Sequence, residues 1–381
     1  MSDYNAKEDK IIEMIESLIR NGVDAELIIS RFESKIFDLK KPELYFWFAK
    51  NVKGIDIESH EQAVIDKRDP EWNYKFAKNV KGSDINAHGQ VIINSGSLEW
   101  NYKFARYIEG ADVEAHERVI IRNGDPCYNY MFARYIEGAD VRAHGQAIIN
   151  SGDLEWNFNF AKNVRGSDVK AHGQVIKDSG DPEWNYKFAK YIDGIDTKSN
   201  GHGEAVINSC DLEWNYKFAR DIIGADVRAH EQVIINNGDP EWNYKFARYI
   251  EGADVRAHGQ AIINSGSLEW NYKFAKDIIG ADVIAHGRVI INSGDPELNY
   301  IFVRDVKGAD VRAHGQAIIN SGDPKWNYLF AEGVNGADVK AHEQVVFKYG
   351  NQIESELESL DNYLDDAIAS SEKDASKSMT K

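Results

Sequence analysis

The stretch DPEWNYKFAKNVKGSDINAHGQVIINSG, residues 69–96, contains the signals for two short helices. Asp69 can cap a helix N-terminus, and a proline suits the first turn that follows. Gly82 can end that helix in the left-handed conformation, and the aspartate two residues later can cap another. We therefore predict a first helix over 70–81 and a second helix over 84–95.

The same pattern continues on both sides of this stretch. All eleven histidines of the chain fall at one position of the pattern, and all seven prolines fall at another. Aromatic anchors recur at 28-residue steps, with one step of 30: Trp72, Trp100, Tyr128, Trp156, Trp184, Trp214, Trp242 and Trp270. Self-similarity at a fixed period predicts a repeat architecture. Eleven repeats are expected, starting near residues 42, 70, 98, 126, 154, 182, 212, 240, 268, 296 and 324.

Each predicted helix has one apolar face. Trp72 and Phe76 share a face of the first helix, and His88 and Ile92 share a face of the second. Neither helix can bury such a surface within 28 residues, so each repeat must pack against its neighbours. The predicted fold is all-α: a right-handed α-solenoid of eleven helix-turn-helix repeats over residues 42–350.

The segments outside the repeats are expected to protect the ends of the array. Residues 1–41 are predicted to form an N-terminal helical cap and residues 351–369 a C-terminal capping helix. Residues 370–381, rich in serine and lysine, are expected to be a disordered tail. One repeat departs from the register, because Asp196 and His202 are six residues apart where the other repeats have four. A kink or an exposed loop is expected there.

The composition limits the class of protein. Apolar residues make up 43% of the chain, which is enough for a core, and the formal net charge of −17 argues weakly against generic polyanion binding. The two cysteines have no framework spacing, and no stretch resembles a signal peptide or a membrane span. We expect a cytoplasmic protein with no membrane association.

The predicted architecture resembles tetratricopeptide, pentatricopeptide and HEAT arrays, although the repeat is shorter and matches none of their signatures. The stretch FARYIEGADVRAHGQAII, residues 246–263, resembles repeats in uncharacterised bacterial and phage proteins. This resemblance spans residues 42–350 and implies the solenoid fold, without implying an activity.

The column of histidines is the first candidate for chemistry. Successive histidines should lie roughly 10 Å apart at the spacing of packed helices, whereas zinc needs ligands at about 2.1 Å. The helical wheel places His88 inside the apolar arc, beside Gly89, which permits close helix approach. We predict structural histidines that hydrogen-bond an inter-repeat carbonyl, with no metal and no cofactor.

The outward face of the second helices is a candidate binding surface, because the concave side of many solenoids is lined by second helices. It carries Arg142, Gln146, Lys170, Gln174, Arg228, Gln232, Arg256, Gln260, Ile284, Arg288, Arg312 and Gln316. Arginine and glutamine side chains can read base edges, so nucleic acid is one possible partner. An ordinary solvated helix face would have the same composition.

A second candidate surface lies at the rim, beside the tryptophans. It is formed by Tyr107, Tyr135, Tyr191 and Tyr249, together with the isoleucines Ile223 and Ile279 at otherwise polar sites. Exposed aromatic and aliphatic side chains of this kind are typical of protein interfaces.

Catalysis is not expected, because an active site combines unlike groups in one pocket and nearly every polar residue here has equivalents in the other repeats. The sequence favours a non-enzymatic binding or scaffold protein that engages a macromolecule, foremost a protein, through its groove or rim. A nucleic-acid-binding helical-repeat protein is the alternative, and homodimerisation stays open.

Overall fold

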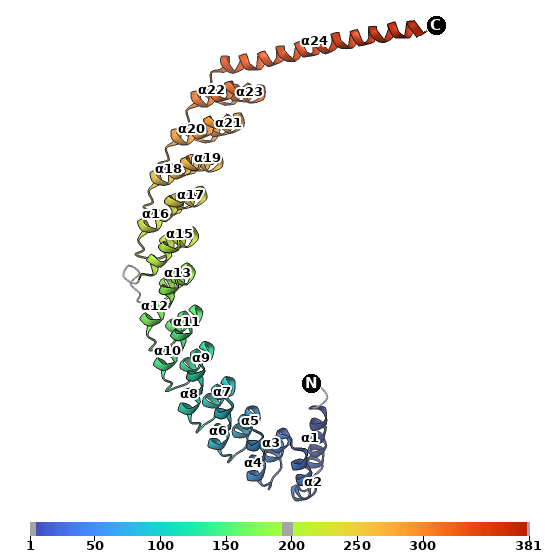
Figure 1. Ribbon diagram of the computed structural model, residues 1–381, viewed down its shortest axis with the longest axis vertical. Helices are drawn as coiled ribbons and strands as arrows, with labels where there is room; N and C mark the ends of the chain where they lie inside the picture. Colours follow the sequence, from blue (N-terminus) through green and yellow to red (C-terminus); the bar gives the residue numbers. More distant parts are fainter. Residues whose placement is uncertain (1–4, 193–200, 379–381) are drawn as a thin grey trace. The chain divides into compact units, whose positions relative to one another are not determined.

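The computed structural model describes residues 5–192 and 201–378, and every regular element in this part of the chain is a helix (Figure 1). Side chains are described for residues 7–192 and 201–364. Within each of the two compact parts of the chain, successive helices form pairs and neighbouring pairs pack together, so the predicted α-solenoid is confirmed. The chain divides into two compact units, residues 1–195 and 196–381, which are described separately.

In the first unit, α1 (Asn5–Arg20) and α2 (Ala25–Leu39) precede the repeats. The first helices of the repeats are α3 (Pro42–Asn51), α5 (Pro70–Asn79), α7 (Leu98–Tyr107), α9 (Pro126–Tyr135), α11 (Leu154–Asn163) and α13 (Pro182–Tyr191). The second helices are α4 (Ile57–Lys67), α6 (Ile85–Ser95), α8 (Val113–Asn123), α10 (Val141–Ser151) and α12 (Val169–Ser179).

In the second unit, the first helices are α15 (Leu212–Asp221), α17 (Pro240–Tyr249), α19 (Leu268–Asp277), α21 (Pro296–Asp305) and α23 (Pro324–Gly333). The second helices are α14 (His202–Ser209), α16 (Val227–Asn237), α18 (Val255–Ser265), α20 (Val283–Ser293), α22 (Val311–Ser321) and α24 (Val339–Ser378). Most of the register break predicted between Asp196 and His202 lies outside the described residues.

The helix caps follow the sequence, but the first helices are shorter than predicted. The Asp69 carboxylate accepts hydrogen bonds from the backbone N–H groups of Glu71 and Trp72. Helix α5 ends at Asn79 rather than at 81, because Val80 takes an extended conformation with φ −102°. This conformation buries the Val80 side chain in the core, and Gly82 makes the turn that follows with φ +86°.

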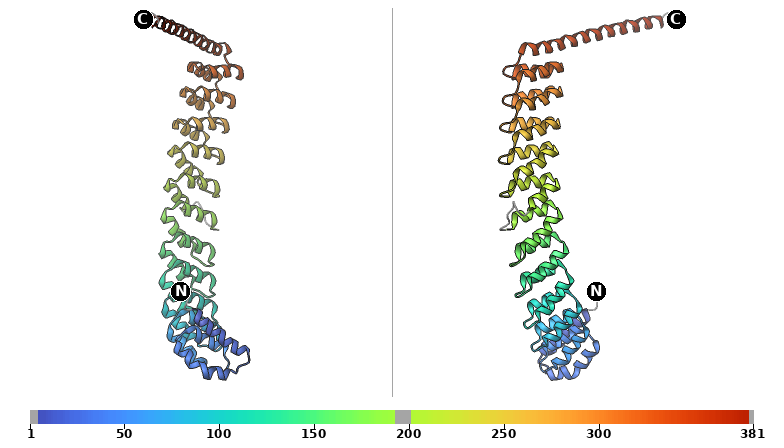
Figure 2. Two further views of the ribbon diagram at one scale, coloured as in Figure 1. Left: turned by 90° about the vertical axis from the view of Figure 1, so that its right-hand side faces the viewer. Right: turned by 60° about the vertical axis from the view of Figure 1, so that its left-hand side comes forward.

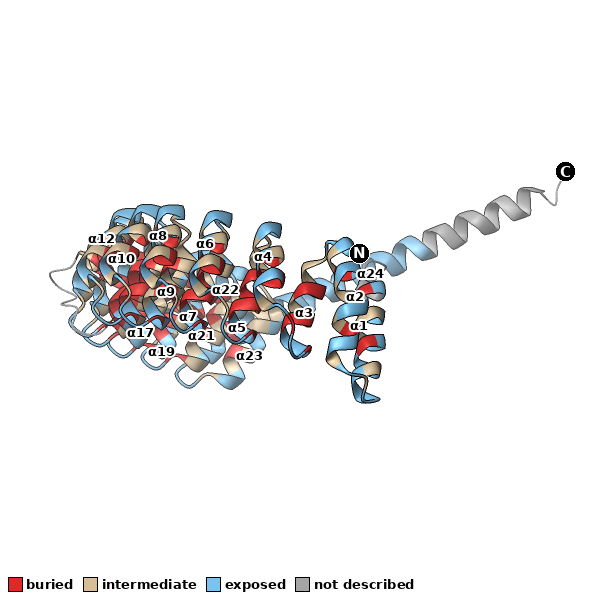
Figure 3. Cartoon of the chain, turned by 90° about the horizontal axis from the view of Figure 1, so that it is seen from below, coloured by how far each residue is buried: buried red, intermediate tan, exposed pale blue. Residues whose placement is uncertain are grey.

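The core clusters lie between successive repeats: Phe104 packs with Ile92 of the preceding repeat, and neither side chain has exposed surface. The tryptophans are only half buried, although the sequence suggested that they were part of the core. Trp100 packs on Tyr74 of the preceding repeat, with 5.3 Å between ring centroids, and Lys103 Nζ lies over the Trp100 ring, 4.3 Å from its centroid. Figure 3 shows the buried residues, in red, along the faces where helices meet.

The helices of the first unit form two rows (Figures 1 and 2). The first helices α5, α7, α9 and α11 lie on the inner side of the curve of this unit, and the second helices α6, α8, α10 and α12 lie on the outer side. This arrangement is the reverse of the one expected by analogy with other solenoids.

The C-terminal region differs from its prediction. In place of a separate capping helix over 351–369 and a disordered tail from 370, α24 continues as one helix of 40 residues to Ser378. Gly350 is followed by Asn351 and Gln352, without the capping aspartate or serine that starts the first helix in the repeats from residue 69 on, so the helix does not break. Its apolar side chains from Ile353 to Leu364 are exposed.

Phe160 and Trp156 provide a test of which aromatic residue holds a repeat together. Phe160 has no exposed surface, so Phe160→Ala should lower the free energy of unfolding by about 3 to 5 kcal/mol. Trp156→Ala should cost less, because its side chain is already partly exposed. Urea denaturation of the two variants checks this, and equal losses would contradict the assignment of the core.

Candidate functional site

A column of buried histidine–asparagine pairs runs through the repeats. In nine of them, the histidine Nδ1 lies 2.6 to 2.8 Å from the Oδ1 of the asparagine that follows the tryptophan position. The histidines in these pairs are at most 1% exposed, and the asparagines are fully buried. Each pair joins the two helices of one repeat.

The asparagine in turn joins its repeat to the preceding one. The Asn101 amide Nδ2 donates to the carbonyl oxygen of Ile92, on the preceding second helix, at 3.0 Å and to that of Ser97 at 2.7 Å. Its Oδ1 must therefore be the acceptor for His116, which places the imidazole hydrogen on Nδ1. The sequence prediction is corrected here: the inter-repeat carbonyl is bound by the asparagine, and the histidine orients that asparagine.

The second ring nitrogen, Nε2, meets a glutamate at some junctions between repeats. Glu61 Oε1 lies 3.1 Å from His88 Nε2 and accepts the backbone N–H of Asp84 at 2.6 Å. Glu117 and Glu231 make the same pair of contacts with the repeats that follow them. A neutral imidazole with hydrogen on Nδ1 presents a lone pair at Nε2, so one proton must lie between Nε2 and the carboxyl group.

At other junctions a glycine replaces the glutamate. A Cβ added to Gly89 would lie 3.4 Å from His116 Nε2 and 3.3 Å from Phe104 Cε1, so the glycine lets the next repeat approach the helix backbone. Nε2 has no hydrogen-bond partner in His116, His172, His230 and His286. A buried polar atom left without a partner costs about 1 to 3 kcal/mol.

The protonation of the column follows from this burial. Burial lowers the pKa of His116 and of His172 to about 4. Burial also raises the pKa of Glu61, although the Asp84 N–H opposes the rise. Both shifts favour the uncharged forms, and a pKa of about 4 leaves His116 and His172 neutral at physiological pH. Within the described residues, no three histidine, cysteine or acidic side chains converge as a metal site would require.

The stripe residues predicted on the second helices are all exposed. Neighbouring second helices pack together, so the structure brings the stripe side chains into rows: α10 with α12 in the first unit, and α16 to α22 in the second. Several glutamines bond within their own helix, as Gln146 does to Asn150 at 2.8 Å and Gln232 to Asn236 at 2.7 Å. In these glutamines the side-chain Nε2 already donates a hydrogen bond within the helix.

The rim tyrosines have partners that the sequence reasoning missed. Tyr107, Tyr135 and Tyr191 are about half exposed, and a cation of the preceding first helix lies over each ring. The distances to the ring centroids are 5.2 Å for Lys78 over Tyr107, 4.8 Å for Arg106 over Tyr135 and 5.1 Å for Lys162 over Tyr191. We call these six residues the cation–tyrosine edge. The sequence contained a signal for these contacts: each preceding repeat has a basic residue immediately before its own tyrosine position.

The corresponding positions of the second unit are different. Asp277 and Asp305 stand at the tyrosine position and accept hydrogen bonds from Tyr244 and Tyr272 at 2.8 and 2.6 Å. Cations of the preceding first helices pair with both carboxylates, as in the 3.3 Å contact of Lys276 with Asp305. The other predicted rim residues of this unit are exposed: Tyr249 by 58%, Ile223 and Ile279 by 96%, and Ile284 by 42%.

Comparisons with known proteins add no family. No protein-family model matches the sequence, and no curated protein matches it significantly. Among the helices of the described ranges, none combines the length and the apolar character needed to cross a bilayer.

The histidine column should make the protein sensitive to acid. The unfolded chain takes up protons near pH 6.5, whereas the folded histidines resist protonation down to about pH 4. Stability is therefore complete above pH 6.5 and falls below it, by up to about 1.4 kcal/mol per pH unit for each histidine. The raised pKa values of Glu61, Glu117 and Glu231 act in the opposite direction but involve fewer groups. Thermal midpoints at pH 8 and pH 5.5 measure this, and equal midpoints would rule it out.

A glutamate at a glycine junction should satisfy the histidine of the next repeat. In Gly89→Glu the new carboxyl group can reach His116 Nε2 and the backbone N–H of Asp112, as Glu61 does at its own junction. We expect a gain of roughly 1 to 2 kcal/mol from helix propensity and the new hydrogen bonds. Gly89→Ala is the matched control, since it adds helix propensity and the same Cβ contact with Phe104 without the carboxyl group. A glutamate variant less stable than the alanine variant would contradict the role of the carboxyl group.

Proposed function

We propose that this chain is a non-enzymatic binding protein that engages a protein partner through the cation–tyrosine edge of its first unit. The observation that carries the proposal is the stacking of Lys78, Arg106 and Lys162 on half-exposed tyrosines of the following repeats. These groups lie on first helices, which form the inner row of that unit (Figure 1).

The chemistry of this edge suits a protein surface. Tyrosine and arginine are enriched among the residues that contribute most to binding at protein interfaces. A tyrosine ring held under a cation has few rotamers left to lose, so the entropic cost of binding it is small. The partner should offer acidic side chains for the cations and flat apolar surface for the rings.

The contrast between the two units supports the choice of this edge. In the second unit, Asp277 and Asp305 neutralise the cations of the equivalent row. Charges paired within the chain have less to gain from a partner, because binding must first displace the existing carboxylate. Ile223 and Ile279, nearly fully exposed, offer the second unit an apolar contact of a different kind.

The interior supports a binding role over catalysis. The buried histidines, asparagines and glutamates bond one another or the backbone, in an arrangement that recurs with the repeat. Such recurrence is what a stacking function requires, whereas catalysis requires a unique constellation.

The proposal is tested by removing the rings. The triple variant Tyr107→Ala, Tyr135→Ala, Tyr191→Ala should lose at least tenfold in affinity for the partner recovered with the wild-type chain from its native host, since one buried tyrosine contributes about 1 to 2 kcal/mol. The matched control is Gln146→Ala with Gln174→Ala, on the outer row of the same unit, which should bind normally. Calorimetry with the purified partner gives the affinities.

Two results would overturn the proposal. Unchanged affinity in the tyrosine variant would place the interface elsewhere. Capture that disappears after nuclease treatment and weakens steeply with salt would indicate nucleic acid, the alternative partner.

A further inference from the structure

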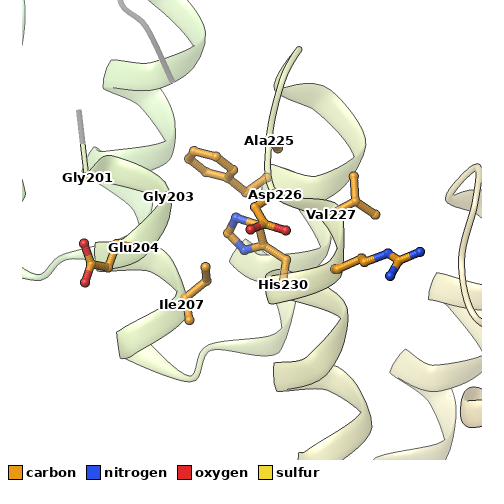
Figure 4. Close-up of a pocket in the computed structure, with 10 residues that line it drawn as sticks. Gly201, Gly203, Glu204, Ile207, Ala225, Asp226, Val227 and His230 are labelled. Carbon is orange, nitrogen blue, oxygen red and sulfur yellow. The ribbon is translucent and has the colours of Figure 1, made fainter. Parts of the chain in front are cut away.

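A cavity of about 670 Å³ lies in the second unit, where α14 meets α16 (Figure 4). Its walls include Gly201, Gly203 and Glu204 from the start of α14, and Asp226 and His230 from α16. The cavity exists where α14 begins directly at His202, whereas other second helices place three residues before their histidine. It is large enough for several atoms of a ligand, since one water occupies about 30 Å³ of liquid.

The floor of this cavity holds an unsatisfied polar group. His230 is fully buried, and its Nδ1 is committed to Asn215 Oδ1 at 2.7 Å. Its Nε2 has no hydrogen-bond partner and faces Gly203, where an added Cβ would lie 3.6 Å from it. Because Nδ1 carries the hydrogen, Nε2 can accept a hydrogen bond from an incoming group.

The same chain shows which group fits this position. At the junctions that follow Glu61, Glu117 and Glu231, the carboxyl oxygen lies 3.1 to 3.2 Å from the next histidine's Nε2. That oxygen also accepts the backbone N–H of the next aspartate cap. Gly203 occupies the position of these glutamates, and Asp226 is the corresponding cap. The cavity therefore lies where a glutamate side chain would otherwise be.

We propose that the cavity at Gly203 is a binding site for a ligand's carboxyl group, which takes the place of the glutamate side chain found at equivalent junctions. One carboxyl oxygen accepts the N–H of Asp226, and a proton joins the carboxyl group to His230 Nε2. The first turn of α14 borders the site, and the N-terminal end of a helix favours an anion.

Binding is coupled to the uptake of one proton, because the lone pair of His230 cannot face a carboxylate without one. Around the site, the Asp226 and Glu204 carboxylates disfavour an anion, and the Arg228 guanidinium favours it. The pKa of His230 is lowered to about 4 by burial, against the opposing effect of Asp226. Neither a free carboxylate nor this histidine holds a proton at pH 7, so affinity should rise about tenfold for each pH unit down to about pH 5.

Propionate is the appropriate probe, since it is the glutamate side chain cut free from the backbone. Titration of the full chain, labelled with ¹⁵N-histidine, should shift the His230 ring resonances saturably, with a Kd on the order of millimolar for so small a ligand. Propionamide supplies its own N–H donor, so its binding should not change with pH. A second arm uses an acetylated and amidated Gly-Glu-Gly peptide, and tighter binding than propionate would identify an acidic protein segment as the source of the carboxyl group.

Matched variants distinguish this site from nonspecific binding. Gly203→Glu should fill the cavity with a tethered carboxyl group, raise the melting temperature and abolish the propionate response of His230. Gly89→Glu makes the same change at another junction and should leave that response intact. Gly203→Ala, a milder block, serves if the glutamate variant does not fold, and should weaken binding at least tenfold.

Three results would overturn the proposal. These are a His230 resonance that does not respond to propionate, a response that persists in both Gly203 variants, and an affinity that stays constant or falls between pH 7 and pH 5.5. None of them bears on the cation–tyrosine edge, so this site and the proposed protein interface can fail independently.

Discussion

The requirement that buried polar groups find partners governs how these repeats stack. An asparagine amide lies at every fully described boundary between regular repeats and donates to a carbonyl of the preceding second helix, as Asn101 does to Ile92. Apolar contact alone would hold the helices together at many spacings, because the hydrophobic effect has no direction. A directed hydrogen bond in a dry interface selects one spacing and one register, since a slip would leave the amide and the carbonyl unpaired. The histidine completes this arrangement by fixing the orientation of the amide.

This constraint determines where the sequence can vary without loss of the fold. In the nine histidine–asparagine pairs, Nδ1 of the histidine and the asparagine amide are both bonded. Nε2 of that histidine instead faces the residue that follows the histidine of the preceding repeat. A glutamate there bonds Nε2 and the following loop, and a glycine there lets the phenylalanine and histidine of the next repeat approach. Both residues preserve the stacking of the repeats. With glutamate the next histidine's Nε2 is hydrogen-bonded, whereas with glycine, as at His116, it has no partner. The shortened helix α14 combines the glycine choice with an open cavity, and that combination makes its junction a candidate site.

The sequence was sufficient to predict those features of the fold that depend on residues within one repeat. Capping aspartates, closing glycines and apolar periodicity predicted the number of repeats, the helix starts and the burial of the histidines. The sequence was not sufficient to predict features that depend on contacts with another repeat. Helix α5 ends where it does because Val80 is buried in the core. The orientation of His116 depends on Asn101, whose amide binds a carbonyl of the preceding helix. The cations over Tyr107 and Tyr135 are 29 residues away in the sequence, so their contact follows from repeat geometry that the sequence does not state. The helical wheel could not distinguish the inner row from the outer row, because curvature arises from the small rotation between successive repeats.

Recognition in such a chain has to come from what differs between repeats. A repeated interior makes every junction nearly equivalent, and an equivalent junction cannot by itself select a partner or a position along the array. The exposed end of the first helices does differ: in three repeats of the first unit a tyrosine under a cation occupies it, and in two repeats of the second unit an aspartate bound to a cation of the preceding repeat does. Changes at these positions leave the buried column untouched, since none of the side chains involved contributes to it. Because the buried column sets the stacking of the repeats, the surface residues can change without loss of the fold. The two units can therefore carry different surface residues on the same repeat structure.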